Sequence, residues 1–272
     1  MDVRAPYAAG LFYVGYEEGL KRDVKRLLGG TEQTGSVDAR GVVVPHAGYE
    51  YSGKVAGSVY SRINVPERMI IIGPNHSGFG YPVSIEDHGY WKTPLGEVEI
   101  DSELAKSLGS HSANIKVSRD AHRLEHSVEV QLPFLQVMAG NGFKFVPMVI
   151  KGGLNLDDCR EIGLAIAMAI KETSDDVLII ASTDFTHYEP EEYAREMDKL
   201  AIDAILEMDP LKLLQTVFEN DITMCGPYGT AAMLYASMEQ GAKKAELVKY
   251  ATSADFSRDT QSVVGYGGLI IR

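Results

Sequence analysis

Short apolar runs rich in β-branched residues alternate with helical patterns along this chain, and this alternation most constrains its fold. The runs cover Val42–Val44, Met69–Ile72, Phe143–Ile150, Val177–Ala181 and Val263–Ile271. Each run has the length of a strand, and apart from Lys144 it has no charged residue, as expected of a strand with both faces buried. Strands that alternate with helices favour a sheet covered on both faces. We therefore predict an α/β fold with a central mixed, mostly parallel sheet flanked by helices.

The segments between these runs carry the marks of helices. We predict helices over Lys54–Ile63, Leu124–Met138, Asp157–Lys171 and Glu191–Met208. In the second segment, apolar residues are spaced four, four and three positions apart from Leu124 onward, which is a helical period. The stretch WKTPLGEVEID contains a turn followed by strand-like alternation, so we predict a β-hairpin at one edge of the sheet.

Length and charge limit the classes of protein that this chain can belong to. Its 272 residues can bury one large core, and no repeat or Pro/Ser-rich linker divides them, so we predict a single domain spanning residues 1–272. The net charge of −12 argues against a nucleic-acid partner and against an anionic membrane surface. No apolar run approaches the roughly 20 residues of a membrane helix. With no signal-peptide pattern, we expect a cytoplasmic protein in which Cys159 and Cys225 are free thiols.

Histidines follow three of the predicted strands at the same topological position. VVVPHAG leads to His46, IIIGPNHSG leads to His76, and VLIIASTDFTHYEP leads to Asp184 and His187. In open α/β sheets, functional groups gather at the carboxyl ends of the strands. Proline and glycine stiffen and tighten the turns that present such side chains. We therefore predict that the three histidines meet in space; the alternative is that each caps its own loop.

Two further stretches supply candidate polar side chains. In NDITMCGPYGTAAMLYASM, Cys225 precedes a predicted helix, whose dipole should lower the pKa of the thiol and favour metal binding or nucleophilic attack. The alternative is a small buried hydrophobe, which suits Cys159 better. In EHSVEVQLPFL, His126 and Glu129 share one face of a predicted helix, and Glu125 is expected to point elsewhere. His126 and Glu129 could form a proton relay, a pair that orients metal ligands, or a surface ion pair.

Two imidazoles and one thiolate, from His46, His76 and Cys225, form a candidate metal site. Three protein ligands leave coordination positions open, and their softness favours iron(II), copper or zinc over magnesium or calcium. His187 is the predicted general acid or base, and Asp184 is predicted to tune or orient it. No role is assigned to the histidines in polar, loop-like stretches, which are His88, His111 and His122.

The motifs of this chain resemble, in order, those of the Memo family, which includes prokaryotic proteins called AmmeMemoRadiSam system protein B. The shared blocks run nearly end to end and are AGLFY, PHAGYEYSG, GPNHSG, EHSVEVQLPFL, STDFTHY, MCGPYG and SVVGYGGLII. The resemblance implies a fold similar to that of the class III extradiol dioxygenases, which are non-haem iron(II) enzymes. It also implies radical SAM and AMMECR-type protein partners.

The resemblance implies roles for individual residues as well. The family's metal site falls on His46, His76 and Cys225, with iron(II) favoured and copper or zinc as alternatives. The position of the dioxygenase acid/base histidine falls on His187, and the family's pocket draws on Phe12 and on Tyr51. Phe12 departs from the tryptophan of eukaryotic relatives, and Cys225 replaces the carboxylate ligand of the true dioxygenases.

The predicted substrate-binding residues are Phe12, Tyr51, His126 and Glu129. Three functions are consistent with this set. The first is a metal-dependent redox enzyme that acts on an unknown small molecule or a peptide, in the manner of a dioxygenase. The alternative is a non-catalytic adaptor that binds a peptide or small ligand in the same pocket. The third is a zinc- or cysteine-dependent hydrolase in which His187 activates water or Cys225.

Overall fold

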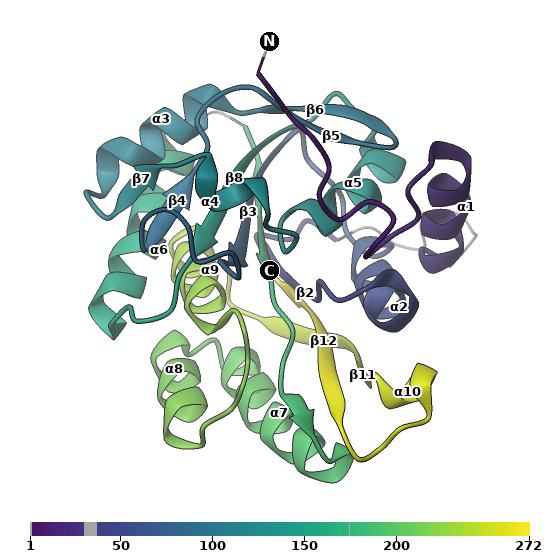
Figure 1. The fold of residues 1–272 in the computed structure, drawn as a ribbon. Coiled ribbons are helices and arrows are strands. Elements are labelled where there is room, and N and C mark those ends of the chain that lie inside the picture. The colour runs from purple at the N-terminus through teal and green to yellow at the C-terminus, as the bar shows by residue number, and fades with distance from the viewer. Residues whose placement is uncertain (1, 30–36, 174) are drawn as a thin grey trace.

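The computed structural model describes residues 2–29, 37–173 and 175–272, and it confirms the predicted α/β fold as a single domain (Figure 1). Within these residues one mixed sheet of 12 strands runs through the molecule. Its main path consists, in spatial order, of β1 (Val3–Arg4), β5 (Tyr90–Thr93), β6 (Gly96–Ile100), β8 (Lys144–Ile150), β3 (Arg68–Pro74), β9 (Val177–Ser182), β2 (Gly41–Val44), β12 (Val263–Ile271) and β10 (His187–Glu189). Off this path, β11 (Ala245–Thr252) pairs with β12, and β4 (Val83–Ile85) pairs with β7 (Ile115–Val117) and β8.

The centre of the sheet is parallel, which decides where the site lies. β6, β8, β3, β9 and β2 all run in one direction, and β12 is antiparallel to β2. The five runs predicted as strands are all strands, and the predicted hairpin forms from β5 and β6. Because β9 lies between β3 and β2 and all three strands are parallel, their carboxyl ends lie side by side at the same end of the sheet.

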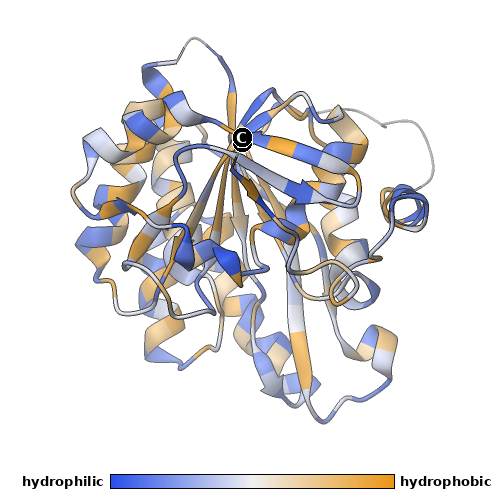
Figure 2. Ribbon diagram, turned by 45° about the horizontal axis from the view of Figure 1, so that its top comes forward, coloured by the Kyte–Doolittle hydropathy of each residue, from blue (hydrophilic) through white to orange (hydrophobic). Residues whose placement is uncertain are grey.

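Helices cover both faces of the sheet. One face carries α3 (Ser102–His111), α6 (Leu156–Lys171), α7 (Glu191–Leu206), α8 (Pro210–Glu219) and α9 (Pro227–Glu239), and the other carries α1 (Glu17–Leu27), α2 (Tyr49–Tyr60) and α5 (Leu132–Ala139). Alternate residues of β3 enter opposite cores, since Ile70 and Ile72 pack on the first face and Met69 and Ile71 on the second. Figure 2 shows the apolar strands at the centre and the hydrophilic residues on the outer surfaces of the helices.

One predicted helix is wrong in its first part. Leu124–Met138 was expected to be continuous, but the chain forms the 3-10 helix η1 (Glu129–Gln131) and then α5, and residues 125–128 are not helical. The cause is a side chain: the Glu125 carboxylate accepts the backbone N–H groups of His126 and Ser127 at 2.9 Å each. Such local bonds compete with the helical ladder. His126 and Glu129 therefore do not share a helix face.

The other predicted helices lie close to their expected places. α6 and α7 match their predictions to within two residues, and α2 begins five residues earlier than expected, at Tyr49. Two one-turn helices, α4 (Asp120–Arg123) and α10 (Ala254–Ser257), complete the described set. No helix in the described part of the chain is long and apolar enough to cross a membrane.

Candidate metal centre

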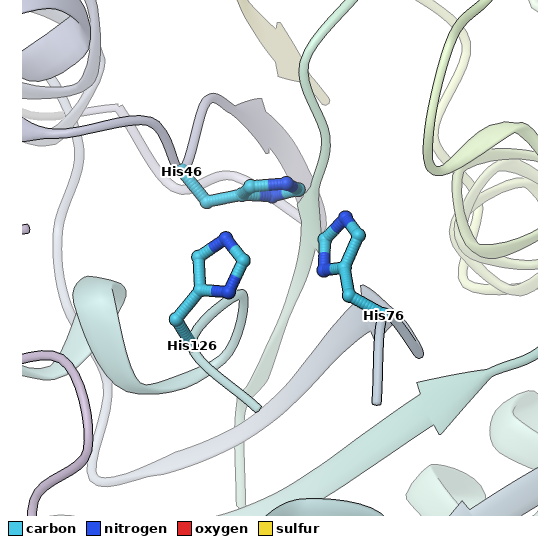
Figure 3. A group of neighbouring side chains, drawn as sticks. All are labelled: His46, His76 and His126. Carbon is cyan, nitrogen blue, oxygen red and sulfur yellow. The ribbon is translucent and has the colours of Figure 1, made fainter. Parts of the chain in front are cut away.

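Three histidines converge at the carboxyl edge of the sheet. His46 lies two residues after β2, His76 lies two residues after β3, and His126 lies in the loop before η1. One ring nitrogen from each side chain lies within 4.8 Å of the other two, and Figure 3 shows the three rings facing one another. These three side chains could hold a metal ion. His187 is not part of this group, so His126 takes the place that the strand pattern predicted for His187.

The rings pack closely around His126. Its imidazole stacks on His76, with ring centroids 4.7 Å apart and an interplanar angle of 18°, and on Phe12, with centroids 4.1 Å apart. The ring of His46 meets both His76 and His126 edge-on, at 5.3 Å and 5.4 Å. Burial, followed by the nearby His46, lowers the pKa of His126 to about 3, so its imidazole is neutral. Phe12 therefore packs against the three-histidine group through His126. Its contact with substrate stays a prediction.

Glu125 holds His76 in place. Its carboxylate is fully buried, and it accepts hydrogen bonds from Nδ1 of His76 at 2.9 Å and from the backbone N–H of His76 at 2.5 Å. Burial alone would raise the pKa of Glu125, but the hydrogen bond and charge of His76 lower it to about 2. Burial alone would lower the pKa of His76, but the hydrogen bond and charge of Glu125 raise it. Because Nδ1 of His76 donates to the carboxylate, Nε2 is the nitrogen that would face an ion, and an ion bound there would displace any proton on it. Glu125 was expected to point elsewhere, and that expectation is wrong.

His46 is held by two residues of β9 and the loop that follows. Its backbone N–H donates to Oδ1 of Asp184 at 2.9 Å, and its Nδ1 lies 3.1 Å from Oγ of Ser182. Burial, together with the neighbouring His76, lowers the pKa of His46 to about 3, which keeps the ring neutral. A neutral imidazole is the form that binds a metal. Ser182 was not predicted from the sequence.

Cys225 lies directly beside His46. Its Sγ is 3.4 Å from Nε2 of His46, and it accepts the backbone N–H of Asp184 at 3.1 Å. The helix dipole was expected to lower the pKa of this thiol, but the pKa is raised. Burial disfavours the thiolate, and the nearby Asp184 carboxyl disfavours it further. Asp184 is itself buried, and burial raises its pKa.

His187 has a partner that the sequence did not predict. Nδ1 of His187 lies 2.9 Å from the carbonyl oxygen of Thr223, and the backbone N–H of His187 donates to Oγ1 of Thr223 at 2.7 Å. A carbonyl only accepts, so Nδ1 carries the proton and Nε2 is free to accept one. Among the described residues, no hydrogen bond joins His187 to Asp184. Their predicted roles as acid/base and tuning residue stay predictions.

Glu129 and Tyr51 lie in very different environments. The Glu129 carboxylate is fully buried and accepts hydrogen bonds from four donors: Arg4 (2.6 Å), the Tyr13 hydroxyl (2.6 Å), and the backbone N–H groups of Tyr7 and Ala8 (2.8 Å each). These bonds fasten the N-terminal segment that carries Phe12. Tyr51 is exposed on α2 and packs edge-on against Phe256, with ring centroids 5.0 Å apart. The contacts of Glu129 and Tyr51 with substrate stay predictions.

A pocket of about 540 Å³ opens beside His76 and Cys225, and the other candidate histidines are not part of its lining. His76, Cys225 and Thr223 contribute to its lining, so a molecule bound there would touch the candidate ligands and the loop that holds His187. One wall carries Phe218 and Tyr228, whose rings lie 5.6 Å apart. The sequence did not predict this wall, because α8, which carries Phe218, has no distinctive motif.

Comparison with known proteins decides the family. The profile described as Memo-like protein matches residues 4–270. The chain belongs to the Memo family. A MEMO1 family protein of Methanococcoides burtonii is 44% identical over 270 residues, covering 99% of this chain and all of that one. A MEMO1 family protein of Methanosarcina acetivorans is 42% identical, and the match covers 100% of both chains. A MEMO1 family protein of Nitrosopumilus maritimus is 39% identical, and the match covers 98% of both chains.

A solved structure supports the fold alone. The uncharacterized protein JW3007 from Escherichia coli K12 superposes with a TM-score of 0.57, covering 84% of this chain and 98% of its own. Its sequence is only 13% identical to this Memo family chain, so the similarity extends to architecture and not to activity.

Proposed function

We propose that this Memo family chain is a metal-dependent redox enzyme that acts on a small molecule, with the ion held by His46, His76 and Cys225. The observation that carries the proposal is the 3.4 Å separation between Nε2 of His46 and Sγ of Cys225. Bond lengths of about 2.1 Å to nitrogen and 2.3 Å to sulfur place two tetrahedral ligand atoms about 3.6 Å apart. The observed separation is thus close to that of two ligands on one ion.

The remaining donors support an ion held by His46 and His76, whereas Cys225 lies outside the group of three histidines and contacts His46 alone among them. Nδ1 of His76 is bonded to Glu125, so Nε2 is the nitrogen of this ring that would face an ion. The raised pKa of Cys225 applies to the metal-free chain, and a coordinated thiol loses its proton outright. His126 belongs to the three-histidine group and is the alternative third ligand. If Cys225 binds the ion, His126 remains beside it as a neutral imidazole that can contact the substrate.

Two imidazoles and one thiolate favour a soft or borderline transition metal. We favour iron(II), and copper and zinc fit the same donors. Iron held there would supply one-electron redox chemistry. The chain's own residues would bind the substrate in the 540 Å³ pocket, whose lining includes Thr223. Nε2 of His187, which Thr223 holds next to this lining, is the proposed proton acceptor. The substrate would be small, because the pocket has the size of a small-molecule site.

The cysteine-hydrolase alternative has less support. A nucleophilic cysteine needs a low pKa, and burial raises the pKa of Cys225 in the metal-free chain. Radical SAM and AMMECR-type partners remain predictions from the family resemblance.

The proposal is tested by anaerobic purification followed by elemental analysis. The proteins are wild type, His46→Ala, Cys225→Ser and the control His111→Ala. His111 is the last residue of α3 and does not belong to the candidate site, and its side chain bonds only to exposed Glu172 among the described residues. We expect near-stoichiometric iron in wild type and in the control, and loss of iron from both site variants. Oxidation of the bound iron should then be reversible and visible by electron paramagnetic resonance.

Two outcomes would contradict the proposal. Wild type that binds no metal after anaerobic reconstitution would make the same residues a recognition pocket, and the adaptor function would then rank first. Wild type that retains only zinc would favour the hydrolase.

A further inference from the structure

Two buried serines connect the loops that carry the three histidines. Ser182 is the last residue of β9, and Ser127 directly follows His126. Oγ of Ser182 donates to the carbonyl oxygen of Ser127 at 2.6 Å, and both residues are at least 99% buried. Neither serine offers an atom to the three-histidine group. Their bonds, however, determine which nitrogen of His46 carries a proton.

The amide of Gln131 fixes one side of this network. Its Nε2 donates to the carbonyl of Pro45 at 3.0 Å and to Oγ of Ser182 at 2.8 Å, while its Oε1 accepts the Tyr60 hydroxyl at 3.0 Å. The carbonyl of Pro45 can only accept, so the amide nitrogen must face it and the amide cannot be flipped. Gln131 therefore donates to Ser182, and it occupies one of the two lone pairs on Oγ.

The remaining bonds of Ser182 leave a single arrangement. Its one hydroxyl hydrogen points to the carbonyl of Ser127, because that oxygen is an acceptor only and lies at the short distance of 2.6 Å. The last lone pair of Oγ then faces Nδ1 of His46 at 3.1 Å. A lone pair needs a donor opposite it, so Nδ1 carries the proton. Nε2 of His46 is left unprotonated, and it is the nitrogen that lies 3.4 Å from Sγ of Cys225.

Ser127 extends the same network to the loop of His76. Its backbone N–H donates to the Glu125 carboxylate at 2.9 Å, and its Oγ donates to the carbonyl of Pro74 at 2.9 Å. Glu125 in turn holds Nδ1 of His76. The backbone of Ser127 thus contacts one residue that orients His46 and another that orients His76.

We propose that Ser182 is a positioning residue that fixes the Nδ1–H tautomer of His46 and so presents Nε2 to a bound metal. The role of this tautomer in metal binding rests on the proposed function. The tautomer itself can be measured in the metal-free protein. Partners that orient metal-binding histidines typically contribute about 10- to 100-fold to metal affinity. Ser182 is expected to contribute on this scale.

The test compares Ser182→Ala with the matched control Ser127→Ala. Both remove one hydroxyl from a buried serine, but Ser127→Ala keeps the backbone groups that bond Ser182 and Glu125 and loses only the bond to Pro74. The metal-free proteins are labelled with ¹⁵N-histidine, and long-range proton–nitrogen correlation spectra report which ring nitrogen is protonated. Zinc and iron(II) titrations then give the metal dissociation constants.

We expect the Nδ1–H tautomer for His46 in wild type and in Ser127→Ala. In Ser182→Ala we expect a shift toward the Nε2–H form and metal binding weakened about 10- to 100-fold. Ser182→Thr keeps the hydroxyl and should restore the wild-type tautomer. An Nε2–H tautomer in wild type would overturn the inference without any variant having to fold. Unchanged tautomer and affinity in Ser182→Ala would also overturn it. Wild type with the Nδ1–H tautomer that binds neither ion would support the inference and contradict the proposed function.

Discussion

Nε2 of His46 and Sγ of Cys225 lie 3.4 Å apart although 179 positions separate the two residues in the sequence. The parallel centre of the sheet brings them together. β2 delivers His46 to the carboxyl edge, and the turn before α9 places Cys225 against the loop that follows the neighbouring strand β9. The metal proposal depends on this contact. Other contacts in the structure lead to quantitative predictions about stability.

Replacing Glu125 should damage both stability and metal binding. Glu125→Gln replaces one oxygen acceptor by an amide donor facing buried N–H groups, so we expect a loss of about 3 kcal/mol of unfolding free energy. The control is Glu172→Gln, because Glu172 also accepts from a histidine, at 3.0 Å, but is exposed. The control should lose far less, because an ion pair in solvent contributes little to stability. Urea denaturation measures both, and equal losses would contradict the role given to Glu125.

The buried ion pair of Arg4 and Glu129 should stabilise the N-terminal segment. Its atoms are 2.6 Å apart, and Glu129→Ala leaves Arg4 and three other donors without their acceptor. We expect a loss of about 3–5 kcal/mol in urea denaturation. The exposed pair of Arg40 and Asp176, at 2.8 Å, gives the control, since Asp176→Ala should cost less than about 1 kcal/mol. A loss below about 1 kcal/mol for Glu129→Ala would show that the pair does not hold the segment.

Glu86 should make the stability of the protein depend on pH. Burial raises its pKa from 4.5 to about 7, and the charges of Arg4 and Arg119 offset only part of this shift. Between pH 4.5 and pH 7 the folded chain therefore binds the proton more tightly than the unfolded chain, so this contribution to stability falls as the pH rises.

Glu86→Gln removes this titration. Its unfolding free energy relative to wild type should rise by up to about 3 kcal/mol between pH 4 and pH 8. Thermal or urea unfolding of both proteins across this range measures the difference. A difference that stays constant with pH would show that Glu86 is ionised normally in the folded state.

Gly73 should be required where β3 passes Ser127. A Cβ at this position would lie 2.3 Å from Oγ of Ser127, so Gly73→Ala must displace the serine or the strand. We expect a loss of about 1–3 kcal/mol. Gly109 in α3 is the control, because a Cβ there meets nothing within 4 Å, and Gly109→Ala should stabilise the protein by about 0.5–1 kcal/mol. The thermal unfolding temperature should therefore fall for Gly73→Ala and rise for Gly109→Ala.

The strands and the general place of the site could be predicted from the sequence because short, local sequence patterns specify both. Apolar β-branched runs specify strands, and a histidine that follows such a run is delivered to the carboxyl edge of a parallel sheet. His46 and His76 were placed together in this way. The hairpin was predictable for the same reason, since its turn and its alternation lie within one short segment.

The parts that were missed depend on contacts between distant segments. The helical period around Leu124 was real, but the bonds of Glu125 to the backbone of His126 and Ser127 broke the helix and turned His126 toward the site. The carbonyl of Thr223 and the hydroxyl of Ser182 bond histidines of other loops, and neither belongs to a recognisable motif. The pKa of Cys225 was predicted in the wrong direction because its burial is not visible in the sequence.

X-ray absorption spectroscopy of iron-loaded wild type and Cys225→Ser tests the central claim most directly, because it reports which atoms surround the metal. The account predicts one sulfur neighbour at about 2.3 Å in wild type, together with nitrogen or oxygen neighbours at about 2.0–2.2 Å. The sulfur signal should be absent from any iron retained by Cys225→Ser. A wild-type spectrum with nitrogen and oxygen neighbours alone would contradict the claim and assign the third ligand to His126.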